Sequence, residues 1–109
     1  MKYLITESQL DKVIFRYLNN QDFIQIEKDN KIYFVNSEND EFGKIRYNKN
    51  TKDYYVDYKL IKEVSSFFSL KIFQSQEVIK GWVENTLQMK VRNFGYTING
   101  IPHELKIPN

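Results

Sequence analysis

The spacing of hydrophobic residues near the N-terminus predicts an amphipathic helix, because apolar side chains recur every three or four positions. These residues are Leu10, Val13, Ile14, Tyr17 and Leu18. Thr6 is expected to cap the helix, and Gln9 three residues later completes a capping box. Ile5 and Leu10 would form a hydrophobic staple across that cap.

Alternating apolar and polar residues follow, and they predict a β-hairpin. Its strands are residues 22–28 and 31–37, joined by a turn at Asp29-Asn30, two residue types that tolerate a positive φ angle. The pairs on one face would be Ile26 with Tyr33 and Ile24 with Val35.

A second hairpin is predicted after it. The segment KIRYN (44–48) leads through the turn-rich KNTKD (49–53) into YYVDY (54–58). In the last strand, the residues on one face would be Tyr54, Val56 and Tyr58, with Tyr55 and Asp57 on the other. The four strands together predict an antiparallel meander.

Helical spacing then returns and predicts two further helices. The first has Asp57 as its expected N-cap, and the second has Ser75. The apolar residues of the first are Leu60, Ile61, Val64, Phe67 and Phe68, and those of the second are Val78, Ile79, Trp82, Val83 and Leu87. Gly81 lies inside the second helix, where glycine costs about 1 kcal/mol relative to alanine, so a close packing contact is expected there.

The C-terminal part predicts a third hairpin around Asn99-Gly100, the strongest turn signal in the chain. The expected pairs are Ile98 with Ile101, Tyr96 with His103, Phe94 with Leu105, and Arg92 with Ile107. Pro102 has no backbone N–H, so its strand should lie at an edge. The expected fold is a single α+β domain over residues 1–109, with an antiparallel β-meander, three helices and a C-terminal hairpin in the order α-ββββ-αα-ββ.

Composition excludes several classes of function. The chain has 109 residues, no cysteine and one histidine, which excludes disulfides, thiolate metal sites and two-histidine metal sites. No apolar run reaches the roughly 18–20 residues of a membrane span, so a membrane partner is not expected. Residues 1–6 lack the apolar stretch of a signal peptide, so secretion by that route is not expected. The net charge of +2 is too small to indicate a nucleic-acid partner.

Residue usage is strongly biased. The chain has no alanine, and Lys, Asn, Ile, Tyr and Phe account for 52 of its 109 residues. These residue types share A/T-rich codons, and the lack of alanine, the best helix former, has no structural explanation. The bias therefore indicates an AT-rich genome.

Two stretches of the sequence resemble proteins of one origin. KYLITESQLDKVI, residues 2–14, resembles the ITESQL start of many small uncharacterised proteins from tailed bacteriophages and environmental viral sequences. Within residues 53–87, DYYVDYKLIKEVSSFFSL and EVIKGWVENTL resemble segments of such proteins as well. The resemblance covers about half of the chain and implies a viral origin. It implies no catalytic residue and no ligand.

Few residues in the sequence could act in acid–base catalysis or bind a metal ion. Glu104, beside the one histidine, His103, would point to the opposite face of a strand, so that histidine lacks an orienting carboxylate. Carboxylates that could serve a two-acid hydrolase are Asp22, Glu27, Asp53, Asp57, Glu63 and Glu84, and none lies in a diagnostic motif. The polar loop NSENDEFG offers oxygen ligands from Asn36, Glu38, Asp40 and Glu41 without the glycine and glutamate positions of an EF-hand. We therefore expect no enzymatic activity, metal or cofactor.

Two segments combine basic and aromatic residues. RNFGY (92–96) matches part of an RNA-binding signature, although the ten residues after Asn99 are too few for the helix and strand that should follow it. Core packing is the preferred interpretation of its aromatic residues. The second hairpin carries cations among tyrosines, which suits nucleic-acid binding but also an ordinary solvated hairpin. The candidate contacts for nucleic acid or another partner are Lys44, Arg46, Tyr47, Lys49, Lys52, Tyr55 and Arg92.

These observations lead to two hypotheses of function. The first is a non-enzymatic bacteriophage accessory or virion-associated protein that binds other protein subunits, such as phage structural proteins, through exposed aromatic surface. The alternative is a small nucleic-acid-binding protein that uses the second hairpin or the RNFGY strand. A small hydrolase is the third alternative. The expected location is the host cytoplasm or the virion.

Overall fold

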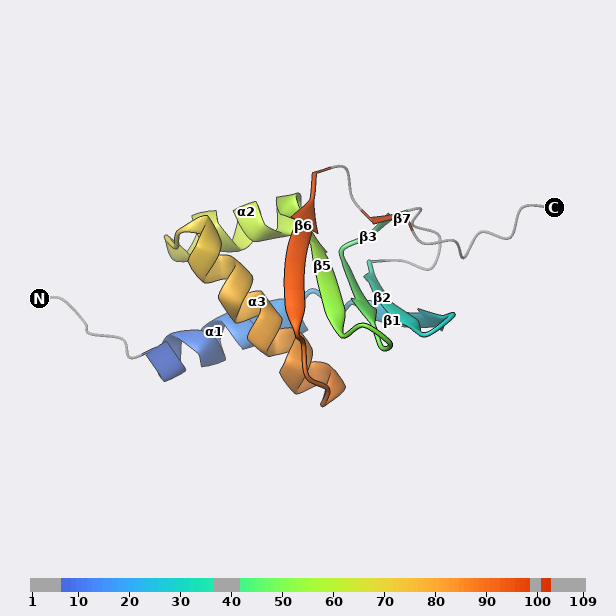
Figure 1. Ribbon diagram of the computed structural model, residues 1–109. Helices are drawn as coiled ribbons and strands as arrows, with labels where there is room; N and C mark the ends of the chain where they lie inside the picture. The colour runs from blue at the N-terminus through green and yellow to red at the C-terminus, as the bar shows by residue number, and fades with distance from the viewer. Residues whose placement is uncertain (1–6, 37–41, 99–100, 103–109) are drawn as a thin grey trace, which may run out of the picture.

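In the computed structural model, the helices lie together on one side of a β-sheet (Figure 1). The structure describes residues 7–36, 42–98 and 101–102, so the expected helix cap Thr6 and its staple residue Ile5 lie outside the described residues. The elements are α1 (Glu7–Asn19), β1 (Ile24–Lys28), β2 (Lys31–Val35), β3 (Phe42–Gly43), β4 (Ile45–Asn48), β5 (Asp53–Asp57), α2 (Tyr58–Phe68), α3 (Ile72–Leu87), β6 (Asn93–Thr97) and β7 (Ile101–Pro102). Within these ranges, a five-stranded mixed sheet has the order β1-β2-β4-β5-β6, and β3 pairs with β7. The predicted α+β class is confirmed.

Four strands of the large sheet form the predicted antiparallel meander, β1-β2-β4-β5. The first hairpin has the predicted register, with Ile26 opposite Tyr33. Its turn residues Asp29 and Asn30 have φ angles of 52° and 66°. A two-residue turn with positive φ at both positions matches the right-handed twist of the strands that it joins, which explains why this register could be predicted from sequence.

The predicted C-terminal hairpin is wrong. β6 runs parallel to β5, with Phe94 opposite Tyr54, and β7 pairs with β3. Ile98, which was expected to face Ile101, is 69% exposed. The other expected partners, His103, Leu105 and Ile107, lie outside the described residues. The two helices between β5 and β6 return the chain to the end of the sheet where β5 begins, so β6 pairs in parallel with the open side of β5 and packs Phe94 against the core.

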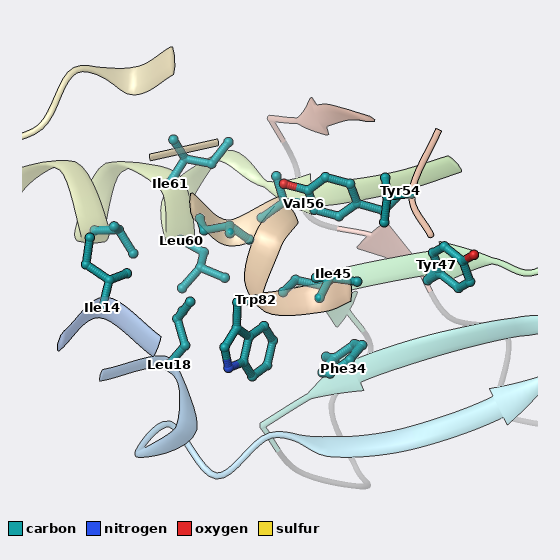
Figure 2. Close-up of a cluster of buried hydrophobic side chains, with 14 of the residues drawn as sticks. Ile14, Leu18, Phe34, Ile45, Tyr47, Tyr54, Val56, Leu60, Ile61 and Trp82 are labelled. Atoms are coloured by element: carbon teal, nitrogen blue, oxygen red, sulfur yellow. The ribbon is translucent and has the colours of Figure 1, made fainter. Parts of the chain in front are cut away.

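The core lies between the helices and one face of the large sheet (Figure 2). The sheet supplies Phe34, Ile45, Tyr47, Tyr54 and Val56, and the helices supply Ile14, Leu18, Leu60, Ile61, Val64, Ile79, Trp82 and Val83. The ring of Trp82 packs with its centroid 5.3 Å from that of Phe34 and 5.9 Å from that of Phe23. Each predicted helical stripe thus faces the sheet, apart from Val13 and Phe67, which are exposed.

The helices α2 and α3 begin differently from each other. Asp57 caps α2 as predicted, because its carboxylate accepts a hydrogen bond of 3.0 Å from the backbone N–H of Lys59. The predicted cap of α3 is wrong: α3 begins at Ile72, and Ser75 lies inside it. Ser75 is buried, with its hydroxyl oxygen 2.7 Å from that of Ser65 on α2. Ile72 packs against the core, which favours a helix start before Ser75.

Gly81 lies where α3 packs against α1. A Cβ atom built on Gly81 would lie 3.6 Å from Cζ of Phe15, which is an ordinary van der Waals distance. The expected helix contact is therefore present at this position, but it is not close enough to require glycine.

Candidate functional site

The sheet face that points away from the helices carries a row of residues across all five strands. Ile26, Tyr33, Arg46, Tyr55 and Gly95 lie opposite one another in successive strands. At one end of the row, Ile26 and Tyr33 pack in a small apolar cluster with Ile101 of β7. The other three residues, Arg46, Tyr55 and Gly95, form what we call the open-face row.

The open-face row is a stack in which a tyrosine ring lies between a cation and a glycine. The guanidinium carbon of Arg46 is 5.2 Å from the centroid of the Tyr55 ring, a cation–π distance. On the other side, a Cβ atom built on Gly95 would lie only 2.9 Å from the ring, so any larger residue would displace it. Nε of Arg46 is buried and has no hydrogen-bond partner among the described residues. The stack holds both side chains at a partly exposed surface of the sheet.

Lys44, which lies next to the open-face row, forms an ion pair within the domain. Its ammonium group lies 3.7 Å from the carboxylate of Asp57, which is buried. Because Asp57 also caps α2, Lys44 supplies a positive charge to a buried helix cap. Lys44 is therefore already engaged within the domain.

Tyr47 does not reach the surface, so the expectation that it contacts a partner is incompatible with the structure. Its side chain is 1% exposed and faces the helices, because it alternates with Arg46 along β4. Its hydroxyl donates a hydrogen bond of 2.7 Å to the backbone oxygen of Lys90. Burial raises the pKa of Tyr47, and the negative charge of Glu84 adds to that rise. Tyr47 is a core residue.

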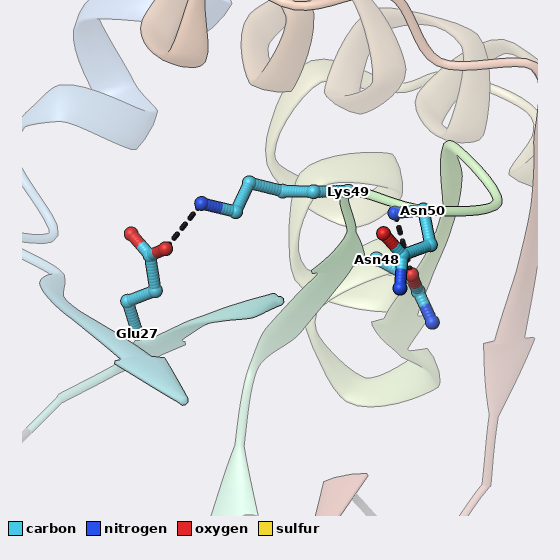
Figure 3. A network of polar contacts seen from close by, with 4 residues as sticks. All are labelled: Glu27, Asn48, Lys49 and Asn50. Atoms are coloured by element: carbon cyan, nitrogen blue, oxygen red, sulfur yellow. Dashed lines mark hydrogen bonds and ion pairs between the residues drawn. The ribbon is translucent and has the colours of Figure 1, made fainter. Parts of the chain in front are cut away.

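Lys49 lies in the turn between β4 and β5 and forms an ion pair with Glu27 of β1 (Figure 3). The turn itself is shaped by Asn48, whose side-chain oxygen accepts a hydrogen bond of 2.9 Å from the backbone N–H of Asn50. The partner of Lys49 is an exposed carboxylate on the first strand of the sheet. Its charge is thus balanced locally.

Lys52 and Arg92 are brought together by the fold although they are far apart in the sequence. The backbone N–H of Arg92 donates a hydrogen bond of 2.7 Å to the backbone oxygen of Lys52. Both side chains are exposed. The φ angle of Lys52 is 62°, a left-handed conformation at the end of the turn before β5. The backbones of these two exposed basic residues therefore meet at the end of the sheet where β5 and β6 begin.

The aromatic residues of RNFGY lie on the helix side of the sheet, on the face opposite Tyr55. Phe94 is half-buried, with its ring centroid 5.8 Å from that of Tyr54. Tyr96 is 48% exposed and stacks on Tyr58 at 5.0 Å between centroids. Core packing therefore describes Phe94, whereas Tyr96 remains available at the surface. The arrangement does not combine these rings with Tyr55 into one stacking platform.

Candidate carboxylates have separate structural contacts. Glu84 accepts a hydrogen bond of 3.0 Å from the backbone N–H of Val91, and Asp53 accepts one of 3.1 Å from the side chain of Asn93. Over residues 7–36, 42–98 and 101–102, no three His, Asp or Glu side chains are grouped so that they could hold a metal ion. The residues of this kind outside the described ranges are His103, Glu104, Glu38, Asp40 and Glu41. Asp22, which follows α1, and Glu63 of α2 are both exposed.

The helical layer carries exposed apolar side chains, of which Val13 and Phe67 were predicted to lie in the buried stripes and Phe73 was not assigned. Phe67 and Phe73 are each 64% exposed, and Val13 is exposed as well. The ring of Phe67 lies 5.0 Å from that of Tyr17, one helical turn along from Val13 on α1. We call these residues, Val13, Tyr17, Phe67 and Phe73, the helical apolar surface. Helical spacing did not reveal this exposure, because the apolar stripe of a helix is wide enough to include two successive residues, as it does for Leu60 and Ile61.

A cavity of about 460 Å³ adjoins this surface between α1 and the start of α3. Its apolar lining comes from Leu10, Leu70, Phe73 and Val78, and its polar lining comes from Asp11, Gln74 and Glu77. The hollow is therefore apolar with acidic side chains beside it. Such a surface suits a partner that brings an apolar group together with a basic one.

Comparisons with known proteins return no match to a family model, to a curated protein or to a solved structure. Within the described part of the chain, none of the helices has the length and apolar character needed to cross a membrane.

Proposed function

We propose that this protein is a non-enzymatic accessory or virion-associated protein of a bacteriophage that works through contacts with other protein subunits. The observation that supports this most is the helical apolar surface, on which Phe67 and Phe73 are each 64% exposed. Aromatic side chains supply much of the binding energy at protein interfaces, and large exposed apolar side chains are a feature of interaction sites. The viral assignment rests on the sequence resemblance of residues 2–14 and 53–87.

The helical apolar surface is held in place before any partner arrives. Tyr17 contacts Phe67 and also meets Phe68, at 5.4 Å between ring centroids with the rings nearly perpendicular. Phe68 in turn packs against the core. A rigid aromatic group loses little conformational freedom on binding, which favours affinity.

Purified particles of the phage that encodes the chain provide the test. Mass spectrometry should detect the protein in them, and a variant combining Phe67→Ser and Phe73→Ser should be incorporated less. Met89→Ser is the matched control, because Met89 is an exposed apolar residue beyond the opposite end of α3. Absence of the protein from particles would contradict the virion-associated role. Equal loss with the Met89 variant would show that the helical apolar surface is not the contact.

A second candidate function is the binding of single-stranded nucleic acid, which the stack of Arg46 on Tyr55 favours. Because Arg46 and Gly95 lie on its two sides, the Tyr55 ring would have to meet a base at its edge or exchange Arg46 for the base, while the nearby cations could contact phosphates. Lys52 and Arg92 add two exposed charges at one end of the sheet. Against this, Lys44 and Lys49 are both paired with carboxylates, so the surface has little free positive charge.

Titration of labelled single-stranded oligonucleotides at two salt concentrations tests this candidate. We expect binding no tighter than a non-specific Kd of about 10⁻⁴ M, because acids are interleaved with the basic residues. If nucleic acid is the partner, Arg46→Gln and Tyr55→Ser should each weaken a sub-micromolar complex, and the complex should weaken steeply with salt. Lys12→Gln on α1 is the control for loss of one exposed charge.

A further inference from the structure

The two edges of the five-stranded sheet differ in how they are protected. β1 and β6 each have a strand neighbour on one side only within the described residues. β1 contains the charged residues Glu27 and Lys28, which is a common way to discourage pairing at an edge. β6 has the sequence NFGYT, with no charge and no proline. By these criteria β6 is the edge that is open to another strand.

The sequence around β6 is compatible with antiparallel pairing to itself. With Gly95 opposite Gly95 of a second copy, Phe94 would face Tyr96 and Asn93 would face Thr97. An aromatic pair thus forms on one face and a polar pair on the other. Just outside the strand, Arg92 would face Ile98, so no two like charges meet.

We propose that β6 pairs antiparallel with β6 of a second copy of this chain, on a two-fold axis through Gly95. The two five-stranded sheets would join into one continuous sheet, and the contact would be isologous, as most homodimer interfaces are. The occupant of this edge is therefore another molecule of the same protein.

The local packing prepares β6 for this contact. Tyr96 is 48% exposed but already stacked on Tyr58, at 5.0 Å between centroids, so its ring is oriented before pairing. The side chain of Ile98 is 69% exposed and would be covered by the second copy. At the axis Gly95 contributes only its backbone, and the ring of Tyr55 from β5 lies over it.

This interface is separate from the helical apolar surface, so the proposal does not depend on the proposed function. Failure of particle incorporation would leave the dimer intact. Loss of the dimer would leave the contacts of Phe67 and Phe73 unchanged.

Sedimentation equilibrium of the purified full chain over a wide concentration range should show a reversible dimer. Ile98→Lys would place a positive charge opposite Arg92 of the other copy, and the two-fold axis repeats this repulsive pair on both sides of Gly95. We therefore expect the dissociation constant to rise roughly three- to thirty-fold. Ile98→Glu removes the same apolar burial but places an opposite charge beside Arg92, so it should weaken the dimer clearly less than Ile98→Lys does. Adding Arg92→Glu to Ile98→Lys should restore association. Both positions are exposed, and circular dichroism checks that the variants fold.

Gln25→Lys on β1 is the matched control, because it adds a charge to the other edge of the sheet at an exposed position. It should leave the dimer unchanged. A protein that is monomeric at every concentration would overturn the proposal. Equal effects of Ile98→Lys and Ile98→Glu would overturn the antiparallel register. Association that is abolished by Gln25→Lys would assign the contact to β1 instead.

Discussion

The indole N–H of Trp82 donates a hydrogen bond of 2.9 Å to the side-chain oxygen of Asn19. This bond joins the middle of α3 to the last residue of α1, and the ring itself packs on Phe34 of β2. One side chain thus contacts two helices and the sheet. The polar end of the indole is satisfied while its apolar body lies in the core, which is the arrangement expected of a buried tryptophan.

Trp82→Ala should lower the free energy of unfolding by about 3–5 kcal/mol, because it leaves a large cavity between the helices and the sheet. Urea denaturation followed by circular dichroism measures this change. Asn19→Ala should cost much less, since it removes the hydrogen bond and leaves the ring in place. Tryptophan fluorescence of the native protein should be shifted to the blue, and an emission spectrum like that of free tryptophan in water would contradict the burial of Trp82.

Asp57→Ala should destabilise the protein by about 0.5–2 kcal/mol, because α2 loses its N-cap. Asp57→Asn should cost less, since an asparagine oxygen can also accept the hydrogen bond from the backbone N–H of Lys59. Lys44→Ala removes the ion pair and keeps the cap, so it distinguishes the two contributions. It should cost about 1 kcal/mol or less. Thermal denaturation of the three variants measures these differences. If Lys44→Ala were as damaging as Asp57→Ala, the ion pair and not the cap would be the stabilising contact.

A double-mutant cycle on Ser65 and Ser75 tests the position of Ser75 inside α3. Ser75→Ala and Ser65→Ala should each cost about 1 kcal/mol, because each leaves the other hydroxyl without its partner. The double variant should cost less than the two single costs added together. Additive costs would mean that Ser75 does not contact α2, as expected if Ser75 were the cap that the sequence suggests.

Stability should fall as the pH rises above about 10, the usual pKa of tyrosine. Burial raises the pKa of Tyr54 well above its usual value, and the charge of Glu77 adds to the rise. The folded state therefore favours the neutral phenol. Its contribution to stability is complete below the unfolded pKa and is lost as the pH rises, at up to about 1.4 kcal/mol per pH unit. Chemical denaturation at a series of alkaline pH values measures that slope.

Tyr54→Phe should make the alkaline slope shallower, since phenylalanine has no proton to lose. At neutral pH the variant should be less stable by about 0.5–1.5 kcal/mol, because the Tyr54 hydroxyl donates a hydrogen bond of 3.1 Å to the backbone oxygen of Gln76. Part of the slope should remain in the Tyr54 variant, because burial also raises the pKa of Tyr17 and Tyr47. An unchanged slope in that variant would contradict the prediction.

Local sequence patterns predicted which residues of the candidate site share one side of a strand. They did not predict which side of the sheet the helices cover. Alternation along β4 and β5 correctly put Tyr55 and Tyr54 on opposite sides of a strand. It could not say which side the helices cover, since both sides carry tyrosines. Tyr47 was therefore expected at the surface and is buried, whereas Phe67 was expected in the helical stripe and is exposed. The proximity of Lys52 to Arg92 depends on the pairing of β5 with β6, which spacing along the chain does not reveal.

The sequence by itself determined the three helices, the antiparallel meander and the register of the first hairpin. These features depend on interactions between residues close together in the chain, such as the Asp29-Asn30 turn and the cap at Asp57. Only the tertiary structure decided the partners of β6 and β7. A turn such as Asn99-Gly100 favours a hairpin locally, but β5 offers β6 an open side and β6 packs Phe94 on the core. Burial of apolar surface between distant segments outweighs a local turn preference, because each buried side chain contributes more free energy than a favourable turn does.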